Sequence, residues 1–323
     1  MEQANKKLKV NNSRSQKLHH KKVGETIFII LMLLWPLLHF LVFWVYVNAN
    51  TFYLSFFRWD TQTAMYEWAG IDRFKVIIES IFVYPDANII NYLKNSGLVF
   101  LVENFIMLPL SLILAFFLSK KVPMSGFFRV VFFLPSIISS VVVAMAYKYM
   151  FDADFGPVNL LLTEIFGSTP DWFSSQSNTA MFMVFFFTVW SGLGYKMLLF
   201  QGAIERIPTE VMEVGKLDGI PLHKEFFKIV LPLVMPTITT FFVMNTLAVF
   251  SYYIHPLLLC GSSGGVNGST GTIALYVFSK VENGSVDGVQ DGAAFGLLFS
   301  LIGVPIILGI KKLLEHLTPD VEF

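Results

Sequence analysis

The sequence has 323 residues, of which 54% are hydrophobic, 16% are aromatic and only 14% are charged. Ordinary soluble domains contain about 45–50% apolar and roughly 25% charged residues, so a single soluble core cannot bury this excess. The formal net charge of zero argues against a nucleic-acid partner, and the single cysteine, Cys260, excludes an internal disulfide and a multi-cysteine metal site. The composition therefore excludes most soluble enzymes, disordered tails and secreted disulfide scaffolds, and it indicates a membrane protein with several spans.

Six segments are long and apolar enough to cross a bilayer as helices, which requires about 20 mostly apolar residues. They lie near residues 26–47, 93–118, 130–150, 179–202, 236–259 and 292–310. Pro135 falls within the third segment, where we expect a kink rather than a break, because neighbouring helices can satisfy the freed carbonyl. The pattern predicts an all-α membrane domain over 26–315, between a basic arm (1–25) and a short tail (316–323).

The distribution of Lys and Arg predicts the orientation of these spans. Sixteen of these residues flank the spans on the side of the N-terminus and four lie in the opposite loops, and such an excess marks the cytoplasmic side. Both termini are therefore expected in the cytoplasm. The outer loop 48–92 is rich enough in aromatic residues for a small folded cap, whereas the outer loop 260–291 is rich in Gly and Ser and is expected to be mobile.

One cytoplasmic segment, 203–236, is too long and too patterned for a simple connector. Pro208 and Glu210 are typical of a helix start, and Asp218-Gly219 is typical of a turn in which glycine takes a positive φ. An amphipathic pattern then resumes at Leu222 and continues to the next membrane entry. The pattern predicts a helix–turn–helix elbow, which either packs on its own bundle or docks into a partner as a rigid knob.

The spacing within this elbow resembles the EAA loop of permease subunits of binding-protein-dependent ABC importers. That loop reads E-A-A, three residues, G, nine residues and then I-x-L-P, and here Glu213–Gly215, Gly219 and Ile229–Pro232 stand at the same intervals. Val and Gly replace the two alanines. The segment Trp190–Gly194 is similar to the W-x-G-x-G segment that leads into the loop. The likeness covers roughly residues 25–315 and is greatest to the maltose and multiple-sugar permease group.

The resemblance implies the function and partners of the chain. It implies a membrane permease subunit of an ATP-driven importer for a sugar or oligosaccharide, which forms half of an alternating-access pathway across a bacterial cytoplasmic membrane. The implied partners are a homologous second permease in a heterodimer, two ATPase subunits, an extracytoplasmic solute-binding protein and membrane lipid. Because this chain lacks the phosphate loop G-x-x-x-x-G-K-[ST], ATP and Mg²⁺ are expected in the ATPase, and no cofactor, metal or catalytic residue is expected here.

The resemblance also implies which residues couple the chain to the ATPase. These are Glu213, Gly215, Asp218, Gly219, Ile229 and Pro232. Glu213 would face a basic residue of the ATPase or, alternatively, only solvent. Gly219 would make the sharp turn, and Asp218 would cap that turn or contact the partner. Ile229 and Pro232 would pack the elbow against the bundle.

The candidates for the substrate pathway are aromatic and polar residues at membrane depth, because a sugar needs both kinds of contact. Asn245 and Tyr252 are preferred, since seven residues, about two helical turns, place them on one helix face. Ser251, Trp190 and Tyr195 are further candidates. The polar groups can instead hydrogen-bond one helix to another.

Two other classes of protein also have an apolar composition of this kind. A secondary transporter driven by an ion gradient would usually show intramembrane carboxylates, and we identify only Glu103 within a span, where Asn104 or a neighbouring helix offers a partner. A membrane-embedded enzyme would cluster Asp, His or Glu, but the six histidines are scattered along the chain. Neither class explains the spacing from Glu213 to Pro232.

Overall fold

The computed structural model describes residues 25–60, 62–63, 65–120, 122–168, 171–174, 179–285 and 287–317. The chain divides after Leu54 into two compact units, and each is described by itself. The expected basic arm and C-terminal tail lie outside the described residues, apart from Glu25 and the first two residues of the tail.

The described part of the first unit is one long apolar helix, Glu25–Leu54. It includes a π-helical stretch, Leu41–Tyr46, and ends as α2 (Val47–Leu54). None of its most apolar stretch is buried. A helix that is hydrophobic all round is stable only inside a membrane or a large core, so this helix fits the first predicted span and extends it.

The second unit begins with the folded cap that the sequence predicts. Strands β1 (Phe57–Asp60) and β2 (Met65–Trp68) form an antiparallel hairpin, which is followed by α3 (Asp72–Phe82). In the hairpin, Trp59 lies opposite Tyr66, with ring centroids 5.0 Å apart. Arg73 of α3 forms ion pairs with Asp287 and Asp291, which tie the cap to the start of the last long helix.

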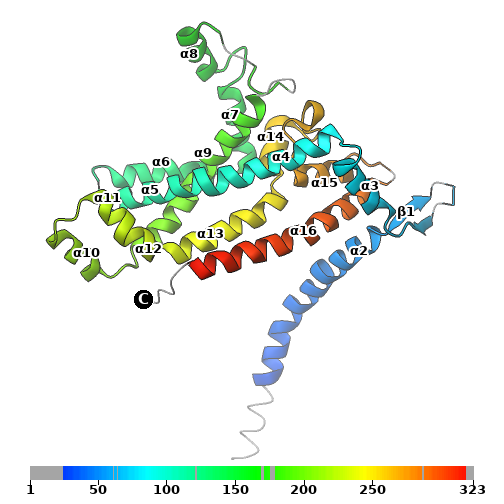
Figure 1. Cartoon of the computed structure of the whole chain (residues 1–323), viewed down its shortest axis with the longest axis horizontal. Coiled ribbons are helices and arrows are strands. Elements are labelled where there is room, and N and C mark those ends of the chain that lie inside the picture. Colours follow the sequence, from blue (N-terminus) through cyan, green and yellow to red (C-terminus); the bar gives the residue numbers. More distant parts are fainter. Residues whose placement is uncertain are drawn as a thin grey trace, which may run out of the picture. The chain divides into compact units, whose positions relative to one another are not determined.

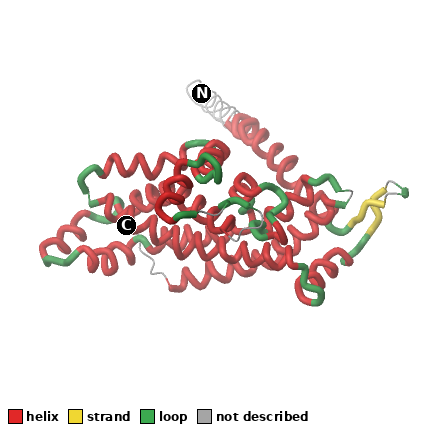
Figure 2. The backbone as a smooth tube through the Cα atoms, turned by 90° about the horizontal axis from the view of Figure 1, so that it is seen from above, coloured by secondary structure: helices red, strands yellow, loops and turns green. Residues whose placement is uncertain are grey.

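The rest of the second unit is helical (Figures 1 and 2). Its segments are α4 (Ala87–Leu101), a π-helical stretch (Val102–Met107), α5 (Leu108–Ser119), α6 (Ser125–Ile137), α7 (Ser140–Met150), α8 (Pro157–Phe166), α9 (Thr179–Ile204), α10 (Thr209–Leu217), α11 (Leu222–Glu225), a π-helical stretch (Phe226–Val230), α12 (Leu231–Leu233), α13 (Met235–Ala248), a 3-10 turn (Val249–Ser251), α14 (Ile254–Cys260), a 3-10 turn (Val266–Gly268), α15 (Ile273–Glu282) and α16 (Gly288–Leu317).

Within the described residues, four helices are long and apolar enough to span a membrane, and two bent pairs raise the number to six if each pair is one span. The four are Glu25–Leu54, Ala87–Ser119, Thr179–Ile204 and Gly288–His316. The bent pairs are Ser125–Ile137 with Ser140–Met150, and Leu222–Leu233 with Met235–Ser251. The all-α membrane fold is therefore confirmed, with strands only in the small cap among the described residues.

Two expectations about helix continuity are wrong. The segment 130–150 is not one kinked helix, because the chain turns by 105° between α6 and α7, where Ile138 is extended just beyond Pro135. The fifth segment is not one helix up to residue 259 either. Helix α13 ends at Ala248 and Tyr252 is extended, so the two-turn argument for Asn245 and Tyr252 fails.

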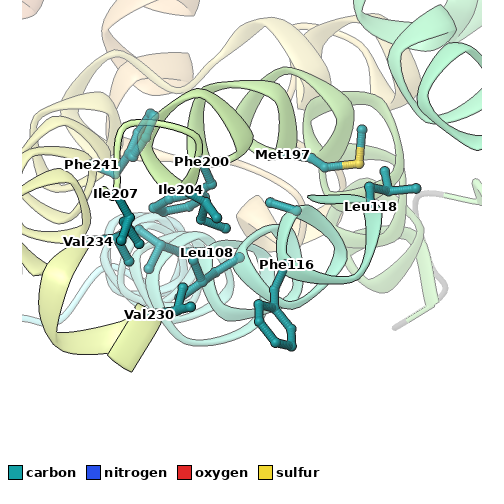
Figure 3. Packing of buried hydrophobic residues seen from close by; sticks show 12 residues of the cluster. Leu108, Phe116, Leu118, Met197, Phe200, Ile204, Ile207, Val230, Val234 and Phe241 are labelled. Carbon is teal, nitrogen blue, oxygen red and sulfur yellow. The ribbon is translucent and has the colours of Figure 1, made fainter. Parts of the chain in front are cut away.

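The main apolar core joins α5, α9 and α13 to the second arm of the elbow, which consists of α11 and the π-helical stretch Phe226–Val230 (Figure 3). Leu112, Met197, Phe200 and Val230 are among its fully packed members. Because Val230 belongs to the second arm of the elbow, that arm is part of the core.

The loop after α14 is folded, contrary to the expectation of a mobile outer loop. The Nδ2 atom of Asn95 donates to the carbonyls of Gly268, Ser269 and Gly271, and the ring of Tyr92 lies so close to Gly271 that a Cβ there would come 1.9 Å from it. The glycines that suggested mobility instead let the loop backbone approach α4 closely.

Candidate functional site

The predicted elbow is present, and its turn depends on Gly219. Helix α10 starts directly after Pro208 and ends at Leu217, and Gly219 takes φ +65°. The amide of Ile220 donates to the carbonyl of Gly215, and the amide of Gly219 donates to the carbonyl of Lys216, both at 3.1 Å. This pair of hydrogen bonds is a Schellman motif, which ends a helix on a residue with left-handed conformation.

The first arm of the elbow, α10, presents an exposed face that is partly apolar. Glu213 and Asp218 are exposed, and so are Leu217 (87%) and Val214 (57%). No described residue forms an ion pair with the carboxylates of Glu213 or Asp218. Side-chain capping of the turn by Asp218 is likewise not among the contacts within the described chain, so both acids are available to a partner.

The second arm holds α10 by a close contact with Gly215. A Cβ built at Gly215 would lie 3.1 Å from Cδ1 of Ile229, so the missing side chain makes room for that isoleucine. Gly215 is buried and Ile229 is half-buried, as expected for packing of the elbow. Pro232, in contrast, is exposed, and its expected packing against the bundle is wrong.

An ion pair that the sequence did not predict fixes the second arm to α5. The carboxylate of Glu225, the last residue of α11, bonds to Nζ of Lys120, which follows the end of α5. The same ammonium lies 5.2 Å from the ring centroid of Phe116, and that ring meets Phe226 edge to face. The second arm is therefore held to the membrane domain by charge and by aromatic packing together.

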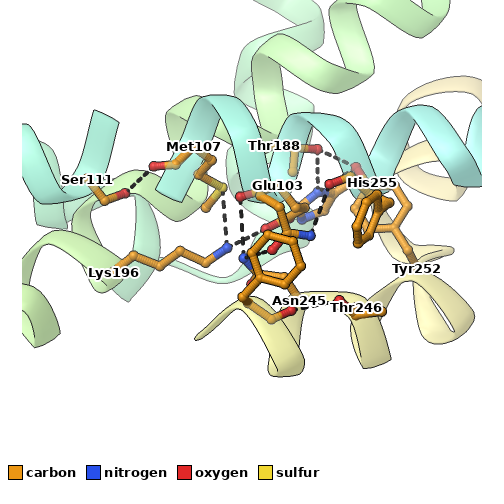
Figure 4. A network of polar contacts seen from close by, with 12 residues as sticks. Glu103, Met107, Ser111, Thr188, Lys196, Asn245, Thr246, Tyr252 and His255 are labelled. Atoms are coloured by element: carbon orange, nitrogen blue, oxygen red, sulfur yellow. Dashed lines mark hydrogen bonds and ion pairs between the residues drawn. The ribbon is translucent and has the colours of Figure 1, made fainter. Parts of the chain in front are cut away.

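A second ion pair lies at membrane depth, between Glu103 and Lys196 (Figure 4). Their side chains are only 12% and 11% exposed, and Nζ of Lys196 also lies 3.6 Å from Sδ of Met107. Glu103 sits in the π-helical stretch Val102–Met107, a conformation that is frequent at functional sites. The two charges neutralise each other, which is the usual way that an ionisable residue is tolerated in a membrane.

Polar residues of α13 and α14 extend this network. Nδ2 of Asn245 donates to the backbone carbonyl of Glu103 and to Oδ1 of Asn104, both at 3.3 Å. Further along, the hydroxyls of Thr188 and Tyr252 bond to each other, and Nδ1 of His255 lies 3.0 Å from the former and 3.2 Å from the latter. The Glu103 cluster connects the π-helical stretch to α9 and α13, and the Thr188 cluster connects α9 to Tyr252 and α14. The two clusters together are the polar network, and its side chains are buried or half-buried.

The predicted substrate residues fall into two groups. Asn245 and Tyr252 belong to the network, although not by the helical spacing that suggested them. Trp190, Tyr195 and Ser251 are exposed on the surface of the subunit. The ring of Trp190 stacks with that of Tyr147, and the hydroxyl of Ser251 donates to the carbonyl of Ala248. Their role in binding substrate stays a prediction.

Sequence reasoning missed Lys196 and Thr188 as members of the network. The signal for Lys196 was present, because a lysine near the middle of an apolar run needs a counter-charge, and Glu103 in another run was the available one. Thr188 and His255 gave no such signal, because a threonine is common in membrane helices and the chain break that brings Tyr252 and His255 to it is not visible in the sequence.

The glycines of the W-x-G-x-G segment allow neighbouring elements to approach α9. A Cβ at Gly194 would lie 2.1 Å from the carbonyl oxygen of Phe132 in α6, and one at Gly192 would lie 2.2 Å from Cε of Met107. Small residues at helix crossings have this purpose in membrane proteins. The motif therefore sets the packing of α6 and of the π-helical stretch against α9.

The fold and these sites define a class of protein: a helical membrane protein with an anchored elbow between its spans. Residues 107–322 match the family described as "Binding-protein-dependent transport system inner membrane component". This match covers about two thirds of the chain, which therefore belongs to that family of membrane transport components. The recognition drawn from the elbow is confirmed.

Two relatives illustrate the extent of the similarity. The chain is 26% identical over 299 residues to the "Multiple sugar-binding transport system permease protein MsmF" of Streptococcus mutans, and the match covers 92% of this chain and 97% of that protein. It is 31% identical over 196 residues to the "Maltose/maltodextrin transport system permease protein MalF" of Salmonella typhimurium, covering 57% of this chain and 37% of MalF.

A solved structure has the same fold. It belongs to a bacterial ABC transporter involved in the import of the acidic polysaccharide alginate, and the compared chain superposes with a TM-score of 0.78 over 93% of this chain and 99% of its own length, at 19% sequence identity. Another structure, of a bacterial alginate ABC transporter in complex with an alginate pentasaccharide-bound periplasmic protein, gives a TM-score of 0.75 over 90% of this chain.

Proposed function

We propose that this chain is the permease subunit of an ATP-driven importer for a sugar or oligosaccharide and that it forms half of the translocation pathway. The observation that carries the proposal is the anchored elbow. Its second arm is part of the core through Val230, whereas α10 exposes Leu217 and Glu213. A helix with an exposed, partly apolar face on a rigid anchor fits docking into a partner better than packing on its own bundle.

The proposal that the substrate is a carbohydrate rests on the relatives. MsmF, which this chain matches over nearly its whole length, is named for multiple sugars, and MalF is named for maltose and maltodextrin. We propose a sugar or a short oligosaccharide for the same reason. Selection among sugars would fall first to the solute-binding protein that delivers the substrate.

The proposed assembly contains this chain, a homologous second permease in a heterodimer, two ATPase subunits and an extracytoplasmic solute-binding protein. ATP and Mg²⁺ would bind to the ATPase, so this chain would be no enzyme itself. Both termini would lie in the cytoplasm of the bacterial membrane, with α10 facing the ATPase. Glu213 would pair there with a basic side chain, and Leu217 would fill an apolar pocket.

Motion would pass from the ATPase to the spans through the second arm. When ATP closes the ATPase dimer, α10 would move with it, and the Gly215–Ile229 contact and the Lys120–Glu225 ion pair would carry that motion to α5. Helix α5 packs along α9 in the core, so both helices would turn together. The outcome is alternating access, in which the substrate site opens to one side at a time.

The exposed residues Trp190, Tyr195 and Ser251 are the candidates that can face a pathway shared with a second permease. Asn245, which is buried, would instead shape the walls by joining α13 to the π-helical stretch. We expect Tyr195→Ala and Ser251→Ala to lower the uptake rate without lowering the melting temperature, and Asn245→Ala to lower the melting temperature. If Tyr195→Ala and Ser251→Ala lowered the melting temperature and Asn245→Ala lowered only the uptake rate, then Asn245 would be the pathway residue and the other two would be structural.

A secondary transporter driven by an ion gradient is the alternative. Glu103 is the carboxylate that such a mechanism would use, but its side chain is occupied by an ion pair with Lys196 inside the bundle. The importer reading accounts for this pair as a structural element and also accounts for the elbow.

The test is co-purification. The chain, with Cys260 replaced by Ser, carries Leu217→Cys on α10 and is expressed with the neighbouring genes of its operon. We expect an ATPase subunit to co-purify and to form a disulfide with position 217 when a cysteine is placed in its apolar groove. Glu282→Cys, at the end of α15, is the matched control and should form no such disulfide. A chain that purifies alone, or crosslinks equally at both positions, would contradict the proposal.

A further inference from the structure

A groove of about 420 Å³ lies between the end of α5 and the second arm of the elbow. Its lining residues are Ile113, Phe116 and Phe117 of α5, together with Leu222, His223, Phe226 and Phe227. All except the histidine are apolar. Ile113, Phe117, Leu222 and Phe227 are between 40% and 63% exposed, so the groove is open on one side.

The end of an apolar span places the groove near the depth where a membrane changes from hydrocarbon to headgroups. Its α5 wall is formed by the last two turns of the apolar span Ala87–Ser119, and Lys120 follows directly. The opposite wall belongs to the arm that precedes the next membrane entry. An open slot with aromatic and aliphatic walls at this depth matches the chemistry of a lipid acyl chain.

Two exposed lysines of the second arm follow the lining residues His223 and Phe227 in the sequence. Lys224 and Lys228 are exposed and stand four residues apart, which places them on one side of the arm, each next to a lining residue in sequence. The only acid of the arm, Glu225, is buried and already bonded to Lys120. Neither Lys224 nor Lys228 forms an ion pair within the described chain, so the two ammonium groups are left without a counter-charge beside an apolar slot.

We infer that this groove binds an anionic phospholipid, with one acyl chain between α5 and the second arm and the phosphate between Lys224 and Lys228. Basic residues beside apolar clefts at the cytoplasmic end of membrane helices recognise anionic headgroups. The inference rests on the proposed function only in placing the elbow on the cytoplasmic side. It adds a lipid contact at the element that carries motion from the ATPase to α5, so anionic lipid would stiffen that element.

The occupant is identified by crosslinking in the assembled transporter. A photoreactive p-benzoylphenylalanine replaces Phe227, and the complex is reconstituted in nanodiscs of phosphatidylcholine with phosphatidylglycerol. Irradiation is expected to add the mass of a phosphatidylglycerol to this chain. A crosslink to the second permease or to the ATPase would overturn the inference, because it would show that protein covers the groove. A crosslink only to phosphatidylcholine would overturn the role of the lysines.

The headgroup contact is tested by native mass spectrometry of the same complex. K224Q/K228Q should lower the occupancy of phosphatidylglycerol by about fivefold for each lysine removed. K311Q/K312Q removes two lysines from the end of another helix and is the matched control, which should retain the lipid. Equal loss in both variants, or no loss in the first, would overturn the inference. Uptake is measured separately, so a complex without ATP-driven uptake that still binds the lipid contradicts only the proposed function.

Discussion

Glu225 and Lys120 form an ion pair that joins the elbow to the C-terminal end of the span containing α5. The side chain of Glu225 is only 8% exposed, whereas that of Lys120 is 20% exposed. A carboxylate buried to this extent is costly unless a cation remains beside it. The pair therefore fixes the distance between α11 and α5, which is the distance that must stay constant if the elbow is to move the spans.

Lys120→Ala is expected to destabilise the protein by about 2 kcal/mol, which is less than the roughly 3–5 kcal/mol typical of breaking a fully buried pair, because the lysine is partly exposed. The measurement is the melting temperature of the purified protein in detergent. Lys216→Ala, which removes an exposed lysine of α10, is the control and should have little effect. The exchange K120E/E225K should recover part of the lost stability. A K120A protein as stable as the wild type would show that the ion pair does not stabilise the protein.

Replacement of Gly219 is expected to uncouple ATP hydrolysis from uptake. A residue with a side chain at φ +65° costs about 1–2 kcal/mol, and proline cannot adopt this angle, so Gly219→Pro should destroy the turn that positions α10. Glu213→Ala should weaken coupling without changing the turn. The measurement is uptake together with membrane insertion. Gly202→Ala, a glycine of α9 with open space around it, is the control. Normal uptake by both G219P and E213A would exclude a coupling role.

The glycines of the segment before the elbow should differ in their sensitivity to alanine. Gly194→Ala places a methyl group 2.1 Å from a backbone oxygen of α6, which cannot move aside, so we expect the upper end of the roughly 1–3 kcal/mol cost of overpacking. Gly192→Ala meets the flexible end of Met107 and should cost less. Gly97→Ala, with nothing within 4 Å, should be neutral. The melting temperature is expected to be highest for G97A, lower for G192A and lowest for G194A. Any other order would contradict the close packing of α6 and the π-helical stretch against α9.

The protein should tolerate replacement of both Glu103 and Lys196 by uncharged residues, but it should not tolerate removal of one charge alone. Lys196→Met alone leaves a carboxylate at membrane depth and should destabilise the protein by about 3 kcal/mol, whereas E103Q/K196M removes both charges and should restore most of the stability. ATP-driven uptake by the double variant should stay within a few-fold of wild type. Complete loss of uptake by a stable double variant would mean that the charges take part in transport.

The sequence predicted the elements whose signals are local. The six apolar segments, the cap and the elbow with its turn at Gly219 each follow from periodicity, composition or turn chemistry over a short window. The departures share a physical cause. The chain breaks after Pro135 and after Ala248 depend on what neighbouring helices offer the freed backbone groups, and no local pattern contains that information.

The contacts between segments far apart in the sequence were the part of the candidate site that was harder to predict. Lys120 and Glu225 are 105 residues apart and Glu103 and Lys196 are 93 residues apart, so their pairing appears only when the helices are packed. Pro232 was expected to be packed because it belongs to the motif, but a proline at the start of a short helix is tolerated for its backbone geometry alone.

The central claim is that this membrane protein imports its substrate with energy from ATP bound by a partner. Its most direct test is uptake of labelled maltose and maltodextrins into proteoliposomes that contain the purified complex, with ATP and Mg²⁺ enclosed and the cognate binding protein outside. The account predicts accumulation of the cognate sugar that requires enclosed ATP and the binding protein and is lost with G219P. Accumulation without ATP, driven by an imposed ion gradient, would contradict it.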